Sequence, residues 1–149
     1  MTHSRNSHEL IWGAFIGALF LWGGASWYWD LTASLSWVAL QWPMFFVLCV
    51  ASPILEEYVF RGMLYEFIDA RCRKVWFFGD YLSISFANAT TTVLFVITHM
   101  ITREPMVGAL VLVPSLYLGL LRHRYGSIGV CMLIHALWNI GWFSLFPPA

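Results

Sequence analysis

The sequence predicts an all-α fold, a polytopic membrane bundle of about five transmembrane helices with an additional interfacial helix. Apolar residues make up 60% of the 149 residues and charged residues make up 11%, against about 45–50% and about 25% in an ordinary soluble domain. The apolar residues form continuous runs without a period-two alternation, and each run is about twice as long as the strand of a membrane barrel. A chain of this length favours one domain, which we place at residues 1–149.

Five apolar runs come near the length of roughly 20 residues that a helix needs to cross a bilayer. The first has 20 residues and no charge. It is longer than the apolar core of about 7–15 residues in a cleaved secretory signal, so we expect it to be retained as a helix. The second passes into two glutamates without a turn signal, and the last is closed by two prolines. The runs are Leu10–Trp29, a second that begins between Ser36 and Trp42 and is apolar through Leu55, then Tyr81–Ile101, Met106–Leu121 and Ser127–Phe146.

The charges indicate the orientation of the chain in the membrane. One strongly polar stretch, Glu66–Asp80, separates the second run from the third. When Arg61 is set aside because it lies within a span, five spans place six lysines and arginines on one side and Arg103 alone on the other. The positive-inside rule then puts the N-terminus in the cytoplasm and the C-terminus outside. The eight basic residues balance the eight acidic ones, so the chain has no basic excess with which to bind nucleic acid.

The cysteines do not indicate a site. Cys49, Cys72 and Cys131 show no CxxC spacing, which argues against a disulfide framework and against a zinc ribbon. We expect them to be small buried hydrophobic residues.

The polar exceptions within the apolar runs are where chemistry is expected. A charge at the centre of a bilayer costs roughly 2.5–3.5 kcal/mol on insertion scales, and such residues usually serve a function. Glu57 and Arg61 stand four residues apart, so on a helix they share a face and can form an ion pair. Glu56 lies about 100° round the helix axis from Glu57 and is left to point elsewhere.

Two further polar groups stand on the last run, and one stands near the end of the third. His135 and Asn139 are also four residues apart, so both could donate to one oxygen atom, as a developing oxyanion requires. His99 could hold a water molecule between itself and Glu56. Taken one at a time, an ion pair or a histidine in a span can be purely structural, and membrane Glu and His also mark the paths of proton or metal carriers.

The polar groups can meet only if they lie at one depth in the membrane. His135 falls near the middle of the last run. Glu56 reaches that depth only if its helix covers about residues 41–68. His99 reaches it only if the third helix begins after about Ser85. Two segments are then left to lie along the membrane interface, Phe67–Phe78 and Tyr81–Ser85.

The polar residues form three motifs that together resemble a known family. The motifs are Glu56-Glu57-x-x-x-Arg61, Phe95-x-x-x-His99 and His135-x-x-x-Asn139, and all three lie on apolar segments. In these motifs and their order the sequence is similar to the CPBP family (CAAX protease and bacteriocin-processing, or Abi), whose members include the type II CAAX prenyl endopeptidases. The motif-bearing core covers about residues 42–142, and the chain resembles little more than the core of the longer members.

The resemblance implies a glutamate-dependent intramembrane endopeptidase. On the family pattern, Glu56 and His99 activate the attacking water. His135 and Asn139 match the pair that stabilises the oxyanion. These four residues are the catalytic residues that the resemblance implies.

The resemblance also bears on supporting residues and on cofactors. Glu57 and Arg61 match the remaining motif positions and are expected to support the site. The chain has no HExxH zinc-protease signature, so we expect no metal and no other cofactor. Glu56, His99 and His135 could still supply a zinc site, and a zinc-dependent protease is therefore an alternative.

The resemblance further implies a partner and a location. The expected partners are the lipid bilayer and a membrane-anchored or lipid-modified protein, cut near its C-terminus in a protein-sorting or CAAX-type step. The expected location is the bacterial inner membrane, with several passes through it. The sequence carries no sign of the oligomeric state. A non-catalytic bacteriocin-immunity or membrane scaffold protein that kept the motifs is the alternative from another class.

Overall fold

The expected all-α class is confirmed by a computed structural model, which is 83% helical and describes residues 7–29, 33–78 and 82–148. The chain divides into two compact units, residues 1–55 with 132–149, and residues 56–131. Each unit is described here by itself. The assignment of residues 1–149 to one domain stays a prediction.

The elements follow one another as helices, with one pair of strands among the described residues. The helices are α1 (Ser7–Trp29), α2 (Leu35–Leu40), α3 (Trp42–Phe46), α4 (Ser52–Glu57), α5 (Tyr65–Asp69), α6 (Phe86–Thr102), α7 (Pro105–Leu110), α8 (Leu112–Tyr125) and α9 (Ile128–Leu145). The strands are β1 (Val75–Phe78) and β2 (Leu82–Ser85). Two wider π-helical segments, η1 (Val47–Ala51) and η2 (Tyr58–Leu64), join α3, α4 and α5 into the continuous helix Trp42–Asp69.

Two helices of the described chain are long and apolar enough to cross a membrane. They are Trp42–Asp69, with 28 residues, and α9, with 18 residues. Shorter apolar stretches lie at Glu9–Gly24 in α1 and along α6. The count of five spans and the orientation of the two termini stay predictions.

The shifted register that the polar residues demand is confirmed for two helices. The helix that carries Glu56 begins at Trp42 and ends at Asp69, close to the expected 41–68. Helix α6 begins directly after Ser85, whose Oγ caps the helix by accepting a hydrogen bond from the backbone N–H of Asn88 at 3.0 Å. Both helices therefore begin where the positions of the polar residues predict.

A proline explains one of the wide turns. Pro53 lies one residue after the start of α4, inside the continuous helix. A proline within a helix has no N–H to donate, and its ring crowds the carbonyl of the residue four positions earlier. That residue is Cys49, and η1 widens the helix around it. Cys49 and Cys131 are buried and Cys72 is half-buried, and all three are free.

The segments Phe67–Phe78 and Tyr81–Ser85 are the ones expected along the interface, and an interfacial helix is wrong for the parts at residues 75–78 and 82–85. These residues pair as antiparallel strands, with Val75 opposite Ser85 and Phe78 opposite Leu82. The sequence of β1 is VWFF and that of β2 is LSIS. Aromatic and β-branched residues in β1 and a period-two alternation in β2 favour strands, and these signals prevail here over the helical context.

The run Met106–Leu121, which is expected to form one span, is not one uninterrupted helix. The structure has two shorter helices, α7 and α8, which are separated at Val111. Pro114 gives the physical reason, because in one long helix its ring would displace the carbonyl of Leu110. As the third residue of α8 it needs no N–H partner. Helix α8 ends at Gly126, whose φ of 66° is left-handed and closes the helix.

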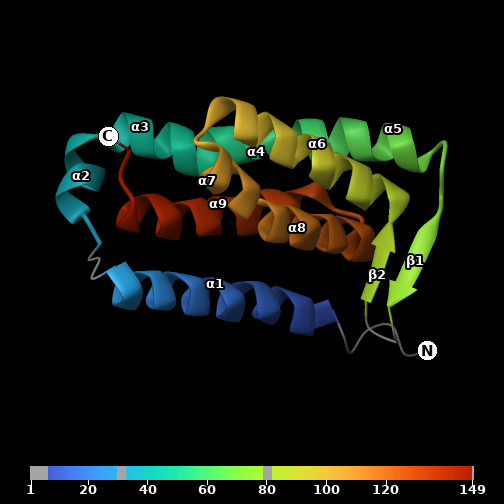
Figure 1. The fold of residues 1–149 in the computed structure, drawn as a ribbon, viewed down its shortest axis with the longest axis horizontal. Coiled ribbons are helices and arrows are strands. Elements are labelled where there is room, and N and C mark those ends of the chain that lie inside the picture. The colour runs from blue at the N-terminus through green and yellow to red at the C-terminus, as the bar shows by residue number, and fades with distance from the viewer. Residues whose placement is uncertain (1–6, 30–32, 79–81, 149) are drawn as a thin grey trace. The chain divides into compact units, whose positions relative to one another are not determined.

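In the unit of residues 56–131, α6 is the central element. It contacts α5, η2, α7 and α8, and the hairpin joins α5 to it (Figure 1). Two glycines make the close contacts possible. A Cβ at Gly108 would lie 2.6 Å from the backbone nitrogen of Met100, and a Cβ at Gly119 would collide with the side-chain amide of Asn88.

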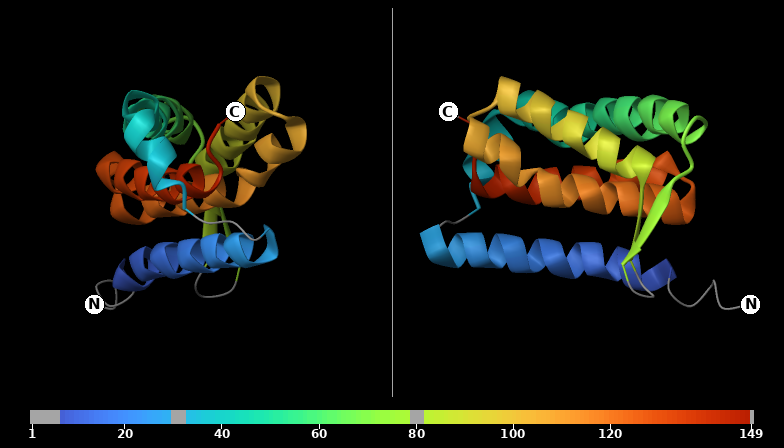
Figure 2. Two further views of the ribbon diagram at one scale, coloured as in Figure 1. Left: turned by 90° about the vertical axis from the view of Figure 1, so that its left-hand side faces the viewer. Right: turned by 45° about the vertical axis from the view of Figure 1, so that its right-hand side comes forward.

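In the other unit, α1 and α9 lie side by side (Figure 2). The indole Nε1 of Trp138 donates to the carbonyl of Ala14 at 3.2 Å. A Cβ at Gly141 would collide with the ring of Trp22, so the absence of a side chain at Gly141 lets the helices approach. These contacts hold α9, the helix that carries His135 and Asn139.

Candidate active site

The ion pair predicted between Glu57 and Arg61 is present and fully buried. Nη1 of Arg61 lies 3.0 Å from Oε1 of Glu57, and both side chains have 0% exposure. Nη2 of Arg61 donates to the carbonyl oxygen of Ser115 at 3.0 Å and to its hydroxyl oxygen at 2.6 Å. The guanidinium also lies over the ring of Phe95, 4.6 Å from its centroid. Because a buried charge is tolerated only with such compensation, this set of contacts explains how the motif exists inside an apolar unit.

Glu56 and His99 are brought together, as predicted. Oε2 of Glu56 lies 3.9 Å from Nε2 of His99. The side chains of Glu56 and His99 are 31% and 22% exposed, so neither is fully enclosed by the protein. This is the pair of groups to which the resemblance assigned water activation.

The other nitrogen of His99 defines the tautomer of the neutral ring. Nδ1 lies 3.0 Å from the carbonyl oxygen of Phe95. A carbonyl oxygen can only accept a hydrogen bond, so Nδ1 carries the proton and Nε2 presents a lone pair. Nε2 and the carboxylate of Glu56 are then two acceptors. Their separation is too long for a direct hydrogen bond, and one water molecule that donates to both would satisfy them.

Phe95 explains the first position of the second motif. Its ring lies 4.3 Å from the ring of His99, with an angle of 33° between the planes. It also makes an edge contact with Phe60, with the ring centroids 5.0 Å apart. The ring thus lies against both Arg61 and His99, and it links the buried ion pair to the pair of Glu56 and His99.

The other two predicted residues lie on α9, in the unit of residues 1–55 and 132–149. His135 is buried. Nδ2 of Asn139 donates to the carbonyl of Leu48 at 2.9 Å. Since an amide nitrogen carries two hydrogens, the second can still donate to an oxyanion. That His135 and Asn139 face Glu56 stays a prediction.

Sequence reasoning missed a set of buried polar residues behind Arg61. Ser115, Thr92 and Asn88 are each buried, and hydrogen bonds connect them in that order. The signal in the sequence was weak, because serine and threonine on apolar helices commonly bond to their own backbone.

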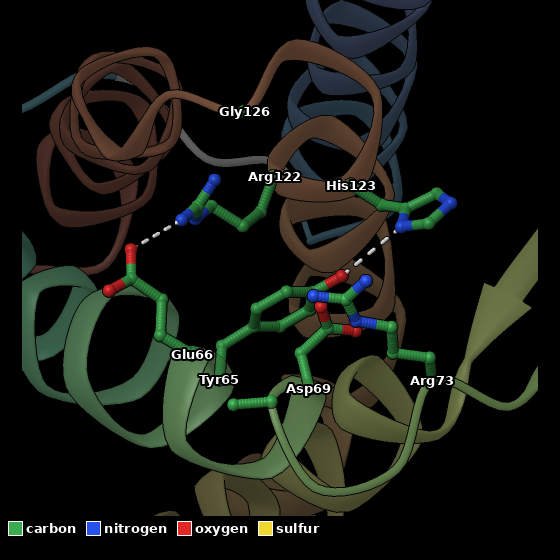
Figure 3. Close-up of a pocket in the computed structure, with 8 residues that line it drawn as sticks. Tyr65, Glu66, Asp69, Arg73, Arg122, His123 and Gly126 are labelled. Carbon is green, nitrogen blue, oxygen red and sulfur yellow. Dashed lines mark hydrogen bonds and ion pairs between the residues drawn. The ribbon is translucent and has the colours of Figure 1, made fainter.

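A polar pocket of about 330 Å³ lies at the ends of α5 and α8 (Figure 3). Glu66 pairs there with Arg122 at 2.7 Å, and the hydroxyl of Tyr65 lies 3.2 Å from Nδ1 of His123. Nε of Arg122 also donates to the backbone carbonyl of Arg61 at 3.0 Å. Several polar side chains that line the pocket therefore hydrogen-bond to one another. One of them, Arg122, also stabilises the helix that carries the first motif.

The described residues contain no group of three or more His, Cys, Asp or Glu side chains gathered as metal ligands. A zinc site would need His135 together with the pair from the other unit. The expectation of no cofactor stays a prediction.

Comparison with protein families identifies a match that covers most of the chain. The model of the family described as type II CAAX prenyl endopeptidase Rce1-like matches residues 36–141, more than two thirds of the chain. The matched range includes all three motifs. Comparisons with curated proteins and with solved structures gave no match.

Proposed function

The chain belongs to the Rce1-like family of type II CAAX prenyl endopeptidases, and on this premise we propose that it is a glutamic-type intramembrane endopeptidase. The family is membrane-integral and proteolytic. The observation that carries the finer proposal is the 3.9 Å separation between the Glu56 carboxylate and Nε2 of His99. It leaves room for one water molecule between two acceptors.

The proposed reaction uses that water as the nucleophile. Nε2 of His99 accepts one hydrogen bond from the water and orients it. The Glu56 carboxylate takes the water's other proton as the oxygen attacks the scissile carbonyl carbon. In the resulting tetrahedral intermediate the former carbonyl oxygen is negative. Glu56 then gives its proton to the amide nitrogen, the C–N bond breaks, and an acid and an amine leave.

The proposal assigns stabilisation of the oxyanion to α9. His135 and Asn139 stand one helical turn apart, so both can donate toward one oxygen atom. Only one hydrogen of the Asn139 amide is needed for its bond to Leu48. Loss of one oxyanion donor typically lowers kcat by about 10²–10³. In this scheme Glu56 is the base, and no cofactor is invoked.

The proposed substrate is a membrane-anchored or lipid-modified protein that is cut near its C-terminus. The family acts on membrane-associated, prenylated proteins. We place this chain in the bacterial inner membrane.

The test compares the C-termini of candidate substrates. C-terminally anchored proteins are co-expressed with the wild type, with Glu56→Gln or with Glu9→Gln, and their termini are read by mass spectrometry. Glu9 is an exposed glutamate in α1, so it is the matched control. We expect a shortened terminus with the wild type and the control, and an intact one with Glu56→Gln.

Two results would contradict the proposal. Cleavage by Glu56→Gln at the wild-type rate would remove Glu56 from the mechanism. A biological effect that persists in Glu56→Gln without any cleavage would indicate the non-catalytic immunity or scaffold protein.

A further inference from the structure

We propose that Ser115 is a positioning residue for Glu56 and His99, and that it acts through Arg61. The inference rests on the proposed function, since it concerns the same water-activating pair. Ser115 belongs to none of the three motifs, and it lies on α8, a helix that carries none of the motif residues.

The first step is the contact between Ser115 and Arg61. One nitrogen of the guanidinium, Nη2, donates to both the carbonyl and the hydroxyl oxygen of Ser115, at 3.0 and 2.6 Å. Ser115 and Arg61 both have 0% exposure. A hydrogen bond from a charged donor is about twice as strong as a neutral one, and it is not weakened here by competing solvent. Ser115 therefore fixes the side of the guanidinium that Glu57 does not hold.

The second step is that the hydroxyl of Ser115 has only one way to orient. Its oxygen accepts from a guanidinium that is always protonated, so its hydrogen must point elsewhere. It donates to Oγ1 of Thr92 at 3.3 Å. Thr92 in turn donates to Oδ1 of Asn88 at 3.2 Å, and Nδ2 of Asn88 donates to the carbonyl of Leu116 at 3.2 Å. The chain of donors thus runs in one direction, from Arg61 to a backbone carbonyl.

The packing supports this chain at its far end. The amide of Asn88 occupies the space that a side chain at Gly119 would fill. Asn88 and Thr92 stand four residues apart on α6. Because both are buried, neither side chain can turn toward water. The hydroxyl of Ser115 is therefore held as an acceptor for Arg61.

The third step connects Arg61 to the reacting groups. The guanidinium lies 4.6 Å from the centroid of the Phe95 ring, and that ring lies 4.3 Å from the ring of His99. The carbonyl of Phe95 also holds Nδ1 of His99. A guanidinium that loses its bond to the Ser115 hydroxyl keeps only the carbonyl bond on that side. It can then shift on the Phe95 ring, and the shift reaches the imidazole that faces Glu56. The expected consequence is a misplaced water with unchanged substrate binding.

The experiment measures kcat and KM for a substrate found by the co-expression test, with purified protein in proteoliposomes. Ser115→Ala removes the hydroxyl with little change of shape. A misplacement of about 1 Å can cost about 10²-fold in rate, and we expect kcat to fall by about ten-fold with KM within about two-fold of the wild type. Ser144→Ala is the matched control, because the Ser144 hydroxyl donates within its own helix, to the carbonyl of Ile140. It should leave both constants unchanged.

A double-mutant cycle distinguishes positioning through Arg61 from a general loss of stability. Arg61→Lys keeps the positive charge but lacks the planar fork that reaches Glu57 and Ser115 together. If Ser115 acts through Arg61, Ser115→Ala changes kcat by less than about two-fold in the Arg61→Lys background. Independent effects would instead multiply.

A second pair of variants decides the outcome if Ser115→Ala does not fold. Thr92→Val keeps the shape of the side chain and removes the acceptor for the Ser115 hydrogen, whereas Thr92→Ser retains it. Thr92→Val should lower kcat without raising KM, and Thr92→Ser should restore it.

The results separate the two proposals. Wild-type kcat in Ser115→Ala, a change in KM alone, or multiplying effects in the cycle would overturn the role of Ser115 while Glu56→Gln remains inactive. If Thr92→Val and Thr92→Ser are measured instead, equal kcat values for these two variants would overturn the role of Ser115. Cleavage by Glu56→Gln at the wild-type rate would overturn the proposed function, and the role of Ser115 with it.

Discussion

The buried ion pair of Glu57 and Arg61 gives the sharpest prediction about stability. Arg61→Met replaces the guanidinium by an apolar side chain and leaves the Glu57 carboxylate buried without its cation. Glu57→Leu does the reverse. The double variant, Glu57→Leu with Arg61→Met, removes both charges at once. We expect each single change to be more harmful than the two together.

The magnitudes follow from the burial of both partners. Both side chains have 0% exposure and are joined at 3.0 Å, so neither charge can be rescued by solvent. Removing one partner of a buried pair costs about 3–5 kcal/mol, whereas replacing both by apolar residues is often neutral. The Ser115 hydroxyl keeps its bond to Thr92 in the double variant, so few polar groups are left unsatisfied. The free energy of unfolding should therefore be lowered less in the double variant than in either single variant.

The assay is equilibrium unfolding in mixed micelles with increasing sodium dodecyl sulfate, followed by tryptophan fluorescence. The four proteins form a double-mutant cycle whose coupling energy is the measured quantity. If the double variant loses the sum of the two single losses, the pair is not the compensated buried pair that the distances describe, and the reasoning is refuted. Cleavage need not be retained in these variants.

Three smaller changes test the packing around the site. Gly108→Ala puts a Cβ 2.8 Å from the backbone carbon of His99. Overpacking costs about 1–3 kcal/mol, so unfolding should come earlier and cleavage should slow; wild-type values for both would contradict the close approach. Gly119→Ala places a Cβ against the amide of Asn88, so it should lower the free energy of unfolding. Adding Asn88→Ala should recover part of that loss. A double variant that is less stable than Gly119→Ala alone would contradict this prediction. Glu66→Gln breaks an ion pair whose carboxylate is 66% exposed, so unfolding should change by less than about 1 kcal/mol, and a larger loss would show that the pair matters more than its exposure indicates.

Much of the site was predictable because a charged side chain in an apolar segment needs a partner, and few partners are available. The spacing of Glu57 and Arg61 predicts their pairing within one helix, and the structure confirms it. The requirement that Glu56 and His99 lie at one depth also predicts where their helices begin. The free-energy cost of a polar group at the wrong depth is larger than the cost of moving a few apolar residues to the membrane interface. Hydropathy alone would have begun the third helix earlier, at about Tyr81, and would have ended the second run near Leu55.

The hairpin and the break between α7 and α8 were not predicted, because both depend on competition between neighbouring signals. Residues 75–85 have the composition of strands but follow a long helix, and the apolar run 106–121 reads as one span unless Pro114 is given weight. The close approach of Gly108 to α6 was equally hidden. A glycine in an apolar run has the same letter whether it packs against a backbone or faces lipid.

The hydroxyl residues show most clearly where sequence reasoning ends. On α6, the hydroxyls of Thr91, Thr98 and Thr102 donate to carbonyls of their own helix. This is the ordinary behaviour of threonine in an apolar helix. Thr92 instead accepts from Ser115, which lies on another helix. Spacing of three or four residues identifies partners within a helix, whereas a partner 23 residues away is fixed only by how α8 packs on α6. The motif residues could therefore be found in the sequence, and the residue that we infer to position them could be found only in the fold.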